Sequence, residues 1–389
     1  MDTEAIRRRV LEDIDRRADL LLDVSHQIHA HPELCFEERF AHDLLTDVLE
    51  REGVPVTRSA YDLPTAFDAR VGTEGPQVAV VCEYDALPGI GHACGHNIIA
   101  AAGLGAGLAL APLAAELGGR LAILGTPAEE GGGGKVFMID RGAFTGVDAS
   151  MMVHPAGAEL RSMQTLANHQ VMTQYRGKAA HAAAAPWRGA NALDAMVLGY
   201  NNVAALRQHI RPDERIHGIF TKAGEKPNIV PDNTEAHWYV RSPDTEHLSV
   251  LKDRVLSCLT AGALAAGCEM QHTWLDPAYD NMIDNHALLD RYVEHARRIG
   301  RDPVEPSGDL VVAGSTDMGN VSHLIPAIHP MVQAAPTGVA IHTTEFAVHA
   351  RAAIGDRAVI DGAKSMALTL LDLWLDDDLR RRVAATRPA

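Results

Sequence analysis

The sequence predicts an α/β fold in which a domain built on a mainly parallel sheet is interrupted by an inserted ferredoxin-like α+β domain. The 389 residues exceed the length of one typical domain. Three apolar runs alternate with helical segments, which favours βα units and a parallel sheet. The pattern changes near Asn168, where segments in the order β-α-β-β-α-β begin. We therefore expect one domain from residues 1–167 and 279–389, and an inserted domain from residues 168–278.

The first domain is expected to open with helices. Apolar residues recur at helical spacing across residues 3–30, which predicts an opening helix over this range. A turn at Pro32 and a second helix ending near Gly53 follow. The three predicted strands lie within VAVVCEYDALPG, LAILGTPAEE and ASMMVHP. Between them we expect an Ala- and Gly-rich helix over residues 98–117 and a short helix over residues 134–142.

The inserted domain is predicted from four strand-like and two helical segments. In chain order they are HQVMTQYRG, the helix ANALDAMVLGYNNVAALRQHI, the strands IHGIFTKAG and EAHWYVRS, the helix HLSVLKDRVLSCLTAGALAAG, and the strand EMQHTWLD. This order is the ferredoxin-like arrangement. The first domain then resumes with the helix LLDRYVEHARRIG and closes with the amphipathic helix DRAVIDGAKSMALTLLDLWL.

Composition excludes several classes of partner. The formal net charge is −16, from 35 basic and 51 acidic residues, whereas nucleic acids and anionic membranes demand a basic surface. Five cysteines form an odd, sparse set without the pattern of a disulfide framework, which fits a reducing compartment. The charged N-terminal segment has no apolar core of a secretion signal, and no uninterrupted apolar run reaches the roughly 20 residues of a membrane helix. We expect a soluble, cytoplasmic protein.

Candidate metal ligands follow each of the three predicted strands. GHACGHN offers Cys94 and His96, PAEEGG offers Glu129 and Glu130, and MMVHP offers His154. Thiolate, imidazole and carboxylate groups bind zinc and related transition metals, and ligand-binding residues of open α/β sheets gather beyond the carboxyl ends of the strands. Taken singly, a cysteine or histidine is more often a buried core residue. Their joint spacing predicts a dinuclear metal site, in which one Glu binds metal and its neighbour takes a proton from water.

The tetraglycine run that follows these glutamates suggests a phosphate-binding loop at first sight, because Lys135 ends it. The run lacks the GxxxxGK[ST] spacing of such loops. We expect the glycines to form a tight turn that lets the backbone approach Glu129 and Glu130.

Nine motifs in order resemble the aminoacylase, carboxypeptidase G and auxin-conjugate amidohydrolase family of dinuclear metallopeptidases. They are HAHPELCFEE, EYDALPG, GHACGHN, PAEEGG, MMVHP, GKAAHAAAAPWRGANALDA, PNIVPD, GSTDMGN and IHTTEF. EYDALPG and GSTDMGN look closest to the branch with p-aminobenzoyl-glutamate hydrolase and dipeptidases for β-alanyl or basic dipeptides. The resemblance implies a catalytic α/β domain interrupted by a ferredoxin-like dimerisation, or lid, domain.

The resemblance also implies a role for each site residue. By this resemblance Cys94 bridges two metal ions, His96 and His154 complete the ligand set of one ion, and Glu130 and His342 complete that of the other. Glu129 is implied as the general base and acid, and Asp85 as a residue that orients a ligand. His181 is implied to reach the active site of the partner subunit, and Asn228 and Arg241 to bind substrate. His342 follows from the resemblance alone. The chain has 20 histidines, and His323, His329 and His349 are competitors nearby.

The function implied is hydrolysis of an amide bond in a small N-acyl amino acid or dipeptide. A hydroxide bridging two divalent transition-metal ions would attack the carbonyl, with Glu129 as general base and acid, in a homodimer. Zinc, manganese, cobalt and nickel all accept such a ligand set. Two alternatives stay open. In the first, Cys94 would be a nucleophile with His96 as its base, although residues two apart rarely bring their side chains into such contact. In the second, the chain would be a catalytically silent binding member of the fold.

Overall fold

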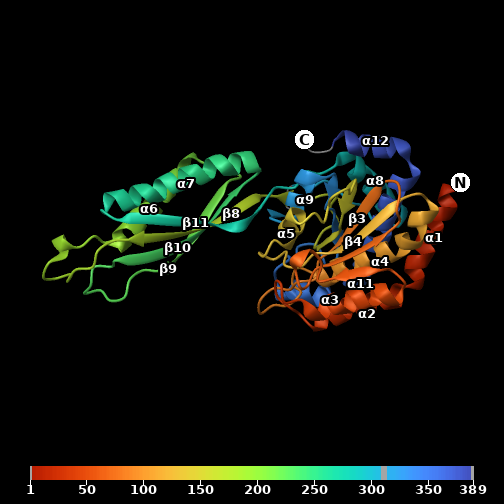
Figure 1. The fold of residues 1–389 in the computed structure, drawn as a ribbon, viewed down its shortest axis with the longest axis horizontal. Helices are drawn as coiled ribbons and strands as arrows, with labels where there is room; N and C mark the ends of the chain where they lie inside the picture. Colours follow the sequence, from red (N-terminus) through yellow and green to blue (C-terminus); the bar gives the residue numbers. More distant parts are fainter. Residues whose placement is uncertain (1, 308–312, 387–389) are drawn as a thin grey trace. The chain divides into compact units, whose positions relative to one another are not determined.

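The computed structural model describes residues 2–307 and 313–386, and the chain divides into two compact units (Figure 1). The larger unit comprises Met1–Gln164 and Met282–Ala389, and the smaller unit comprises Thr165–Asn281. The sequence places the borders at residues 167/168 and 278/279, a few residues inside those of the structure. The reason at the second border is the last strand of the smaller unit, which continues far enough for Tyr279 to pair with Asn168.

The larger unit is built on a six-stranded sheet in the order β1-β2-β4-β3-β5-β13. Strands β4, β3, β5 and β13 are parallel, whereas β1 and β2 join the edge in antiparallel fashion. This arrangement confirms the predicted α/β class with a mainly parallel sheet. The strands of this unit are β1 (Val56–Arg58), β2 (Phe67–Val71), β3 (Gln77–Cys82), β4 (Arg120–Gly125), β5 (Ala149–Met151), β6 (His154–Ala156), β13 (Ala327–Ile328) and β14 (Met331–Gln333). Its helices are α1 (Thr3–Arg16), α2 (Ala18–Ala30), α3 (Arg39–Arg51), α4 (His96–Glu116), α5 (Gly134–Asp140), α8 (His286–Arg298), α9 (Met318–Leu324), α10 (Thr344–His349), α11 (Ala353–Leu375) and α12 (Asp377–Ala385). Two short strands, β7 (Gln164–Thr165) and β12 (Ala313–Gly314), pair with each other.

The opening segment forms two helices where the sequence predicts one. Helix α1 ends at Arg16, and α2 begins at Ala18 in a different direction (Figure 1). Between them Arg17 adopts φ −91° and ψ 2°, and its guanidinium pairs with Asp13 and with Glu52 after α3. A regular apolar spacing does not report such a break, because both helices keep their apolar faces on the same core.

Helix α4 is the central helix of the larger unit. It packs against β3 and β4 and against helices α2 and α11, and its small residues allow this close approach on several sides. Among the described residues, it is the one helix that is long and apolar enough to cross a membrane, and most of it is buried inside the unit. Its uniform apolarity is therefore explained by a position in the core.

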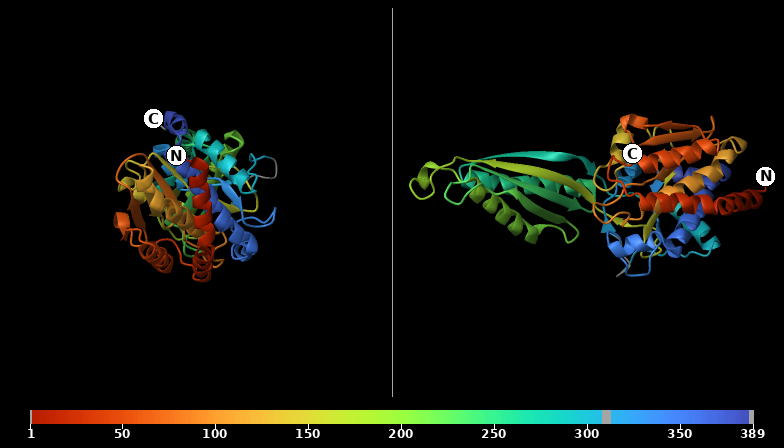
Figure 2. Two further views of the ribbon diagram at one scale, coloured as in Figure 1. Left: turned by 90° about the vertical axis from the view of Figure 1, so that its right-hand side faces the viewer. Right: turned by 90° about the horizontal axis from the view of Figure 1, so that it is seen from below.

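The smaller unit has the predicted ferredoxin-like order of elements. These are β8 (Ala167–Arg176), α6 (Ala192–Leu206), β9 (Arg215–Lys222), β10 (Asn233–Ser242), α7 (Thr245–Ala265) and β11 (Glu269–Tyr279). The strands form an antiparallel sheet in the order β11-β8-β10-β9, and both helices cover one face of it (Figures 1 and 2). Alternate residues of β10 are buried, as expected for a sheet with one covered face.

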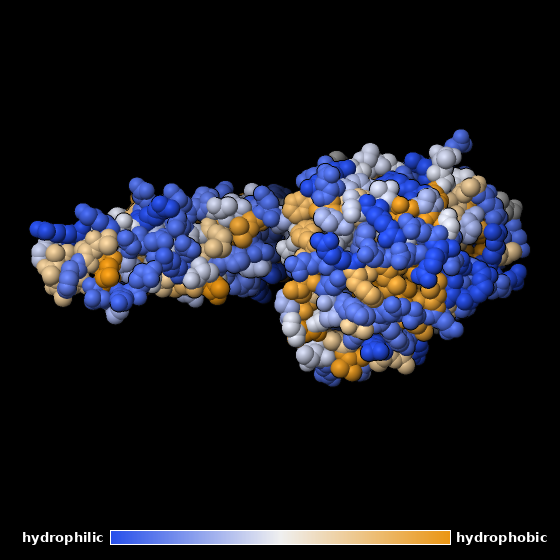
Figure 3. All heavy atoms as spheres, turned by 60° about the horizontal axis from the view of Figure 1, so that its bottom comes forward, coloured by the Kyte–Doolittle hydropathy of each residue, from blue (hydrophilic) through white to orange (hydrophobic). Residues whose placement is uncertain are grey.

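The surface of the smaller unit carries separate hydrophobic groups on a mainly hydrophilic face (Figure 3). Ile219 on the edge strand β9 is 65% exposed, and Leu264 on α7 is 75% exposed. Single exposed apolar residues are common on soluble proteins, but β9 also offers the unpaired backbone edge of the sheet.

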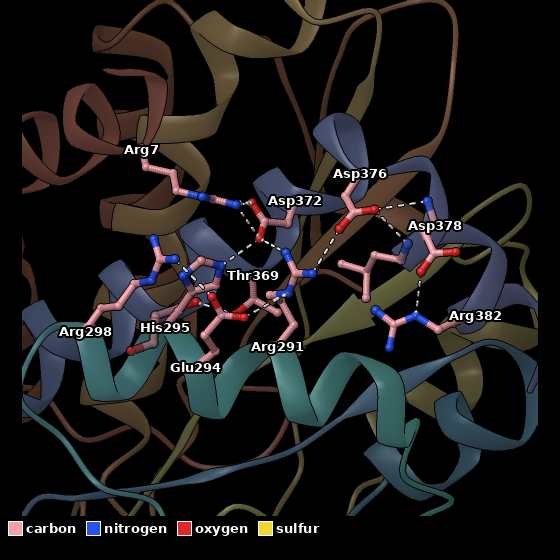
Figure 4. A network of polar contacts seen from close by, with 12 residues as sticks. Arg7, Arg291, Glu294, His295, Arg298, Thr369, Asp372, Asp376, Asp378 and Arg382 are labelled. Carbon is pink, nitrogen blue, oxygen red and sulfur yellow. Dashed lines mark hydrogen bonds and ion pairs between the residues drawn. The ribbon is translucent and has the colours of Figure 1, made fainter. Parts of the chain in front are cut away.

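Charged residues of three helices in the larger unit form a buried cluster of hydrogen bonds and ion pairs (Figure 4). Asp372 of α11 accepts hydrogen bonds from Arg7 of α1, at 2.8 Å, and from Arg291 and His295 of α8. We call these four residues the Asp372 cluster. Its carboxylate is fully buried, and each of its oxygens receives a cationic or imidazole donor.

Candidate metal centre

Three neighbouring strands deliver the predicted site residues to one edge of the sheet. Strands β4, β3 and β5 lie side by side and run parallel, so their carboxyl ends meet at the same edge. Asp85 follows β3, the Glu129–Glu130 pair follows β4, and His154 follows β5. His96 is the first residue of α4, directly after the segment that carries Cys94.

The five predicted metal ligands form two groups that share Cys94. Cys94, His96 and His154 offer ligand atoms within 4.8 Å of one another, and so do Cys94, Glu130 and His342. The Cys94 Sγ lies 3.4 Å from the His154 Nε2, and the His342 Nε2 lies 3.3 Å from the Glu130 Oε1. The His342 side chain is 51% exposed, whereas the other four are largely buried. A shared thiol between two three-residue groups is the geometry that a bridging ligand requires.

Hydrogen bonds orient both buried imidazoles. The Nδ1 of His96 donates to Asp85 Oδ1 at 2.9 Å, and the Nδ1 of His154 donates to the Pro155 carbonyl at 2.8 Å. In its neutral form each ring therefore carries its proton on Nδ1 and presents a lone pair on Nε2, as metal-binding histidines do. Asp85 Oδ2 also accepts the backbone N–H of Glu130 at 2.9 Å, so this one carboxylate links a histidine to the glutamate segment.

The backbone turns sharply at two places to assemble these groups. Gly95 has φ +79°, and a Cβ there would lie 2.6 Å from the Pro155 Cγ, so only glycine fits between Cys94 and α4. His342 has φ +63°, and its N–H donates to the Ala93 carbonyl at 2.8 Å. This bond joins the GHACGHN segment to the remote segment that carries the fifth predicted ligand.

The turn at Gly95 corrects the expectation that the side chains of Cys94 and His96 lie apart. Residues two apart rarely bring their side chains together, yet the ligand atoms of Cys94 and His96 lie within 4.8 Å, because the left-handed residue between them reverses the chain. Proximity alone therefore does not exclude the thiol–imidazole alternative. In the protein alone, however, burial and the neighbouring Glu130 raise the pKa of the Cys94 thiol well above its ordinary value, which opposes a free thiolate.

The charges around His96 fit a bound cation. Its Nε2 is buried without a hydrogen-bond partner, and carboxylate oxygens of Glu83, Glu129 and Glu130 lie 3.7, 3.9 and 3.9 Å away. Three carboxylates so close together repel one another, and a positive charge among them offsets this repulsion. In the protein alone burial opposes protonation of His96, but Cys94 and Asp85 raise the pKa of His96 well above its ordinary value, and a bound cation would take over this role. Sulfur, nitrogen and oxygen donors in one cluster suit a divalent transition metal.

The neighbouring carboxylates also change the pKa of Glu129. Burial, followed by the carboxylates of Glu83 and Glu130, raises the pKa of Glu129 well above its ordinary value. A carboxyl group with a raised pKa holds a proton more readily than an ordinary glutamate, as a general base and acid must.

The three other predicted site residues lie in the smaller unit. His181 and Asn228 are exposed neighbours, since the Ala182 N–H donates to the Asn228 carbonyl at 3.1 Å. The His181 Nδ1 accepts the backbone N–H groups of Ala183 and Ala184, so in the neutral ring the proton is on Nε2, which is then a donor. Arg241 lies on β10 with its guanidinium over the Tyr239 ring, 5.4 Å from the ring centre.

Sequence reasoning missed Glu83, the third carboxylate beside His96. Its ligand atom lies within 4.8 Å of those of His96 and Glu129. The available signal was its position two residues before Asp85 in EYDALPG, because alternate residues of an extended segment point to the same side. Of the competing histidines, His329 is buried against His154, with ring centres 5.2 Å apart, but it belongs to none of the ligand groups found among the described residues.

Comparisons with known proteins agree with this arrangement. A model of peptidase family M20/M25/M40 matches residues 79–370. The chain is 40% identical to the Xaa-Arg dipeptidase of Mus musculus, over 96% of this chain and 90% of that protein. It is 30% identical to a p-aminobenzoyl-glutamate hydrolase chain of Escherichia coli, over 92% of this chain and 89% of that protein.

Solved structures share the fold over both units. A dinuclear metal-binding peptidase of the M20 family from Bacillus subtilis superposes with a TM-score of 0.74 at 20% identity, covering 93% of this chain and 99% of that chain. An aminobenzoyl-glutamate utilization protein from Klebsiella pneumoniae gives 0.68 at 20% identity, covering 90% and 97%. The resemblance drawn from the motifs is confirmed. Since the family model spans most of the chain and the mouse relative matches nearly all of it, the chain belongs to peptidase family M20/M25/M40.

Proposed function

We propose that the protein hydrolyses the amide bond of a small dipeptide or N-acyl amino acid with two divalent transition-metal ions as cofactors. The observation that carries this proposal is the pair of ligand groups sharing Cys94, with the carboxylate of Glu129 beside them. Cys94, His96 and His154 would hold one ion, and Cys94, Glu130 and His342 the other. Bound there, the ions would polarise the amide carbonyl and lower the pKa of water.

Glu129 is the group that moves the proton. It lies on the segment after β4, next to Glu130, and its carboxylate oxygen is 3.9 Å from the His96 Nε2. As general base it takes a proton from the attacking water, and as general acid it hands that proton to the leaving amine. Asp85 holds His96 and the Glu130 backbone in place, so that Glu129 keeps its position during both steps.

In a dimer, the smaller unit of one subunit would place a hydrogen-bond donor in the active site of the other subunit, where it would stabilise the developing oxyanion. His181 is exposed and carries its proton on Nε2, so it is able to donate a hydrogen bond to a substrate carbonyl. Exposed Ile219 and the edge strand β9 favour a homodimer formed through the smaller unit. Asn228, beside His181, and Arg241 would bind the substrate.

The substrate class rests on the relatives. The mouse relative is named for dipeptides ending in arginine, and the bacterial relative for an aminobenzoyl-glutamate amide. Dipeptides with a basic C-terminal residue are therefore the first class to test, and p-aminobenzoyl-glutamate and N-acyl amino acids follow. The acidic net charge of −16 supports small molecules rather than nucleic acid or anionic membranes as partners. The five unpaired cysteines support a cytoplasmic location, which cell fractionation would test.

The deciding experiment combines metal analysis with a substrate panel. Protein stripped with EDTA and reconstituted with zinc, manganese, cobalt or nickel should contain about two ions per chain and cleave at least one panel member. Activity that survives complete removal of metal would contradict the proposal and favour Cys94 as a nucleophile. Metal binding without cleavage of any amide would favour a silent binding member of the family.

The action of His181 across subunits is tested by mixing. His181→Ala and Glu129→Gln proteins are each expected to be inactive, but heterodimers formed by subunit exchange contain one intact combination of His181 and Glu129. Recovery of part of the activity on mixing supports action across subunits. If exchange is verified by mass spectrometry and no activity returns, His181 acts within its own chain.

A further inference from the structure

A buried lysine lies behind the candidate metal centre without belonging to it. The Lys135 side chain is fully buried in α5, and its Nζ lies 2.5 Å from Glu83 Oε1 and 2.6 Å from Asp317 Oδ1. Both carboxylates are fully buried as well. An unpaired buried charge is costly, so the three groups depend on one another for their ionised states. We call Glu83, Lys135 and Asp317 the Lys135 triad.

One contact of the triad anchors the loop that carries Glu129 and Glu130. The Lys135 backbone N–H donates to Asp317 Oδ2 at 2.9 Å, just after the tetraglycine run. At the other end of that run, the Glu130 N–H donates to Asp85 Oδ2 at 2.9 Å. Glycine is the most flexible residue in the backbone, and a Cβ at Gly134 would lie 1.9 Å from the Pro127 carbonyl oxygen. A loop that must contain glycine is thus held at both ends by buried carboxylates.

The other contact of the triad directs Glu83 toward the site. One oxygen of Glu83 pairs with Lys135, and the other lies 3.7 Å from the His96 Nε2. The ligand atoms of Glu83, His96 and Glu129 lie within 4.8 Å of one another. The ammonium group therefore holds a third carboxylate at a set distance from a metal ligand and from the general base.

We propose that Lys135 is a positioning residue for the hydrolytic reaction, which fixes the Glu129–Glu130 loop through Asp317 and restrains Glu83 beside His96. This inference rests on the proposed function. Lys135 touches neither substrate nor metal ligand directly, and it acts through the groups that it holds. Its loss shifts the general base and frees Glu83 to approach a bound cation.

The test compares Lys135→Met with the triple variant Lys135→Met/Glu83→Gln/Asp317→Asn. The single variant leaves two buried carboxylates without their counter-charge, whereas the triple variant removes all three charges and keeps an amide oxygen to accept the backbone N–H of residue 135. We expect the melting temperature to fall in the single variant and to recover in the triple variant. We expect kcat to fall about 10- to 100-fold in both, with KM changed less than about threefold.

Cobalt supplies a readout besides activity. Wild type and both variants keep the five ligands, so each should bind about two Co²⁺ ions per chain in an anaerobic titration. The visible absorption bands of the cobalt-loaded single variant should shift, because Glu83 is released next to His96. In the triple variant the bands should return toward those of wild type, because the Glu83→Gln substitution removes the charge that approaches the ion.

A purely structural role predicts different results. A triple variant that regains both stability and full kcat, or a folded Lys135→Met protein with wild-type kcat and unchanged cobalt bands, would overturn the positioning role. Asp372→Asn, which breaks a buried charge cluster elsewhere in the same unit, is the matched control and should lose stability with kcat unchanged. If wild-type protein itself binds no cobalt and cleaves no amide, the proposed function fails, and that outcome is distinct from an active wild type with an unaffected variant.

Discussion

The Asp372 cluster and the candidate metal centre are two buried groups of charges in the same unit, and they are balanced in opposite ways. In the Asp372 cluster one carboxylate receives Arg7, Arg291 and His295 (Figure 4). Burial raises the pKa of Asp372. The hydrogen bonds and charges of His295, Arg7 and Arg291 outweigh this effect and lower the pKa to about 2. In the metal centre, burial and the carboxylates of Glu83 and Glu130 instead raise the pKa of Glu129.

The difference shows which cluster is complete without a ligand. The protein supplies the positive charge for Asp372, so that cluster joins helices and is expected to contribute to stability. The candidate metal centre assembles donor atoms and carboxylates around the His96 Nε2, which has no hydrogen-bond partner, so a bound cation would add to the charge of Lys135, which pairs with Glu83. Substitutions in the two regions should therefore separate stability from activity.

The largest expected effect is on the rate. Glu129→Gln removes the proton acceptor but keeps the size of the side chain, so kcat should fall about 10²- to 10⁴-fold with about two metal ions still bound. Steady-state kinetics and elemental analysis measure both. Glu159→Gln, at a partly buried glutamate paired with Arg301, is the control and should leave kcat unchanged. Retained activity in Glu129→Gln would show that another group moves the proton.

The Asp372 cluster should show the opposite response. Asp372→Asn leaves Arg7 and Arg291 without a buried counter-charge, and the free energy of unfolding should fall by about 3 kcal/mol with metal content and kcat unchanged. Urea unfolding measures the loss. Glu116→Gln, which breaks the exposed pair with Arg9, should cost less than about 1 kcal/mol. Equal losses in the two variants would contradict a structural role for the buried cluster.

A smaller effect is expected at Asp85, which links two of the predicted ligands, His96 and Glu130. In Asp85→Asn the amide is able to accept either the His96 Nδ1–H or the Glu130 N–H, but its NH₂ group then faces the other donor. Metal affinity should fall about 10- to 100-fold. Isothermal titration with Co²⁺ gives the affinity, and the melting temperature of the metal-free protein serves as the control for folding. An unchanged affinity would remove Asp85 from the site.

The smallest effect is the pH dependence of the stability that the Asp372 cluster provides. The pKa of Asp372 is about 2 in the folded protein, below its ordinary value of 3.8. The stability that this difference provides is present above the ordinary value and is lost as the pH falls toward 2. It corresponds to about 2 kcal/mol. The difference in unfolding free energy between wild type and Asp372→Asn should therefore shrink by this amount between about pH 5 and about pH 2, and a constant difference would refute the assignment.

Much of the site was predictable because parallel strands bring their carboxyl ends to one edge of a sheet. Cys94, His96, Glu129, Glu130 and His154 all belong to short segments that follow apolar runs, and the structure places their ligand atoms together. The ferredoxin-like order of the smaller unit was visible from its segments alone. His342 needed the resemblance, because a distant segment with a left-handed residue leaves no periodic signal.

Local sequence by itself determined β3, β4, β5, the strands of the smaller unit, the buried helix α4 and the chemistry of the ligand set, because these depend on apolar spacing and on side-chain type. Only the tertiary structure decided the break at Arg17, the approach of Cys94 to His96, and the placement of Glu83, Lys135 and Asp317 behind the site. These features are contacts between segments far apart in the chain or turns set by a single backbone angle. Their energies come from packing and charge pairing in three dimensions, which no spacing along the sequence encodes.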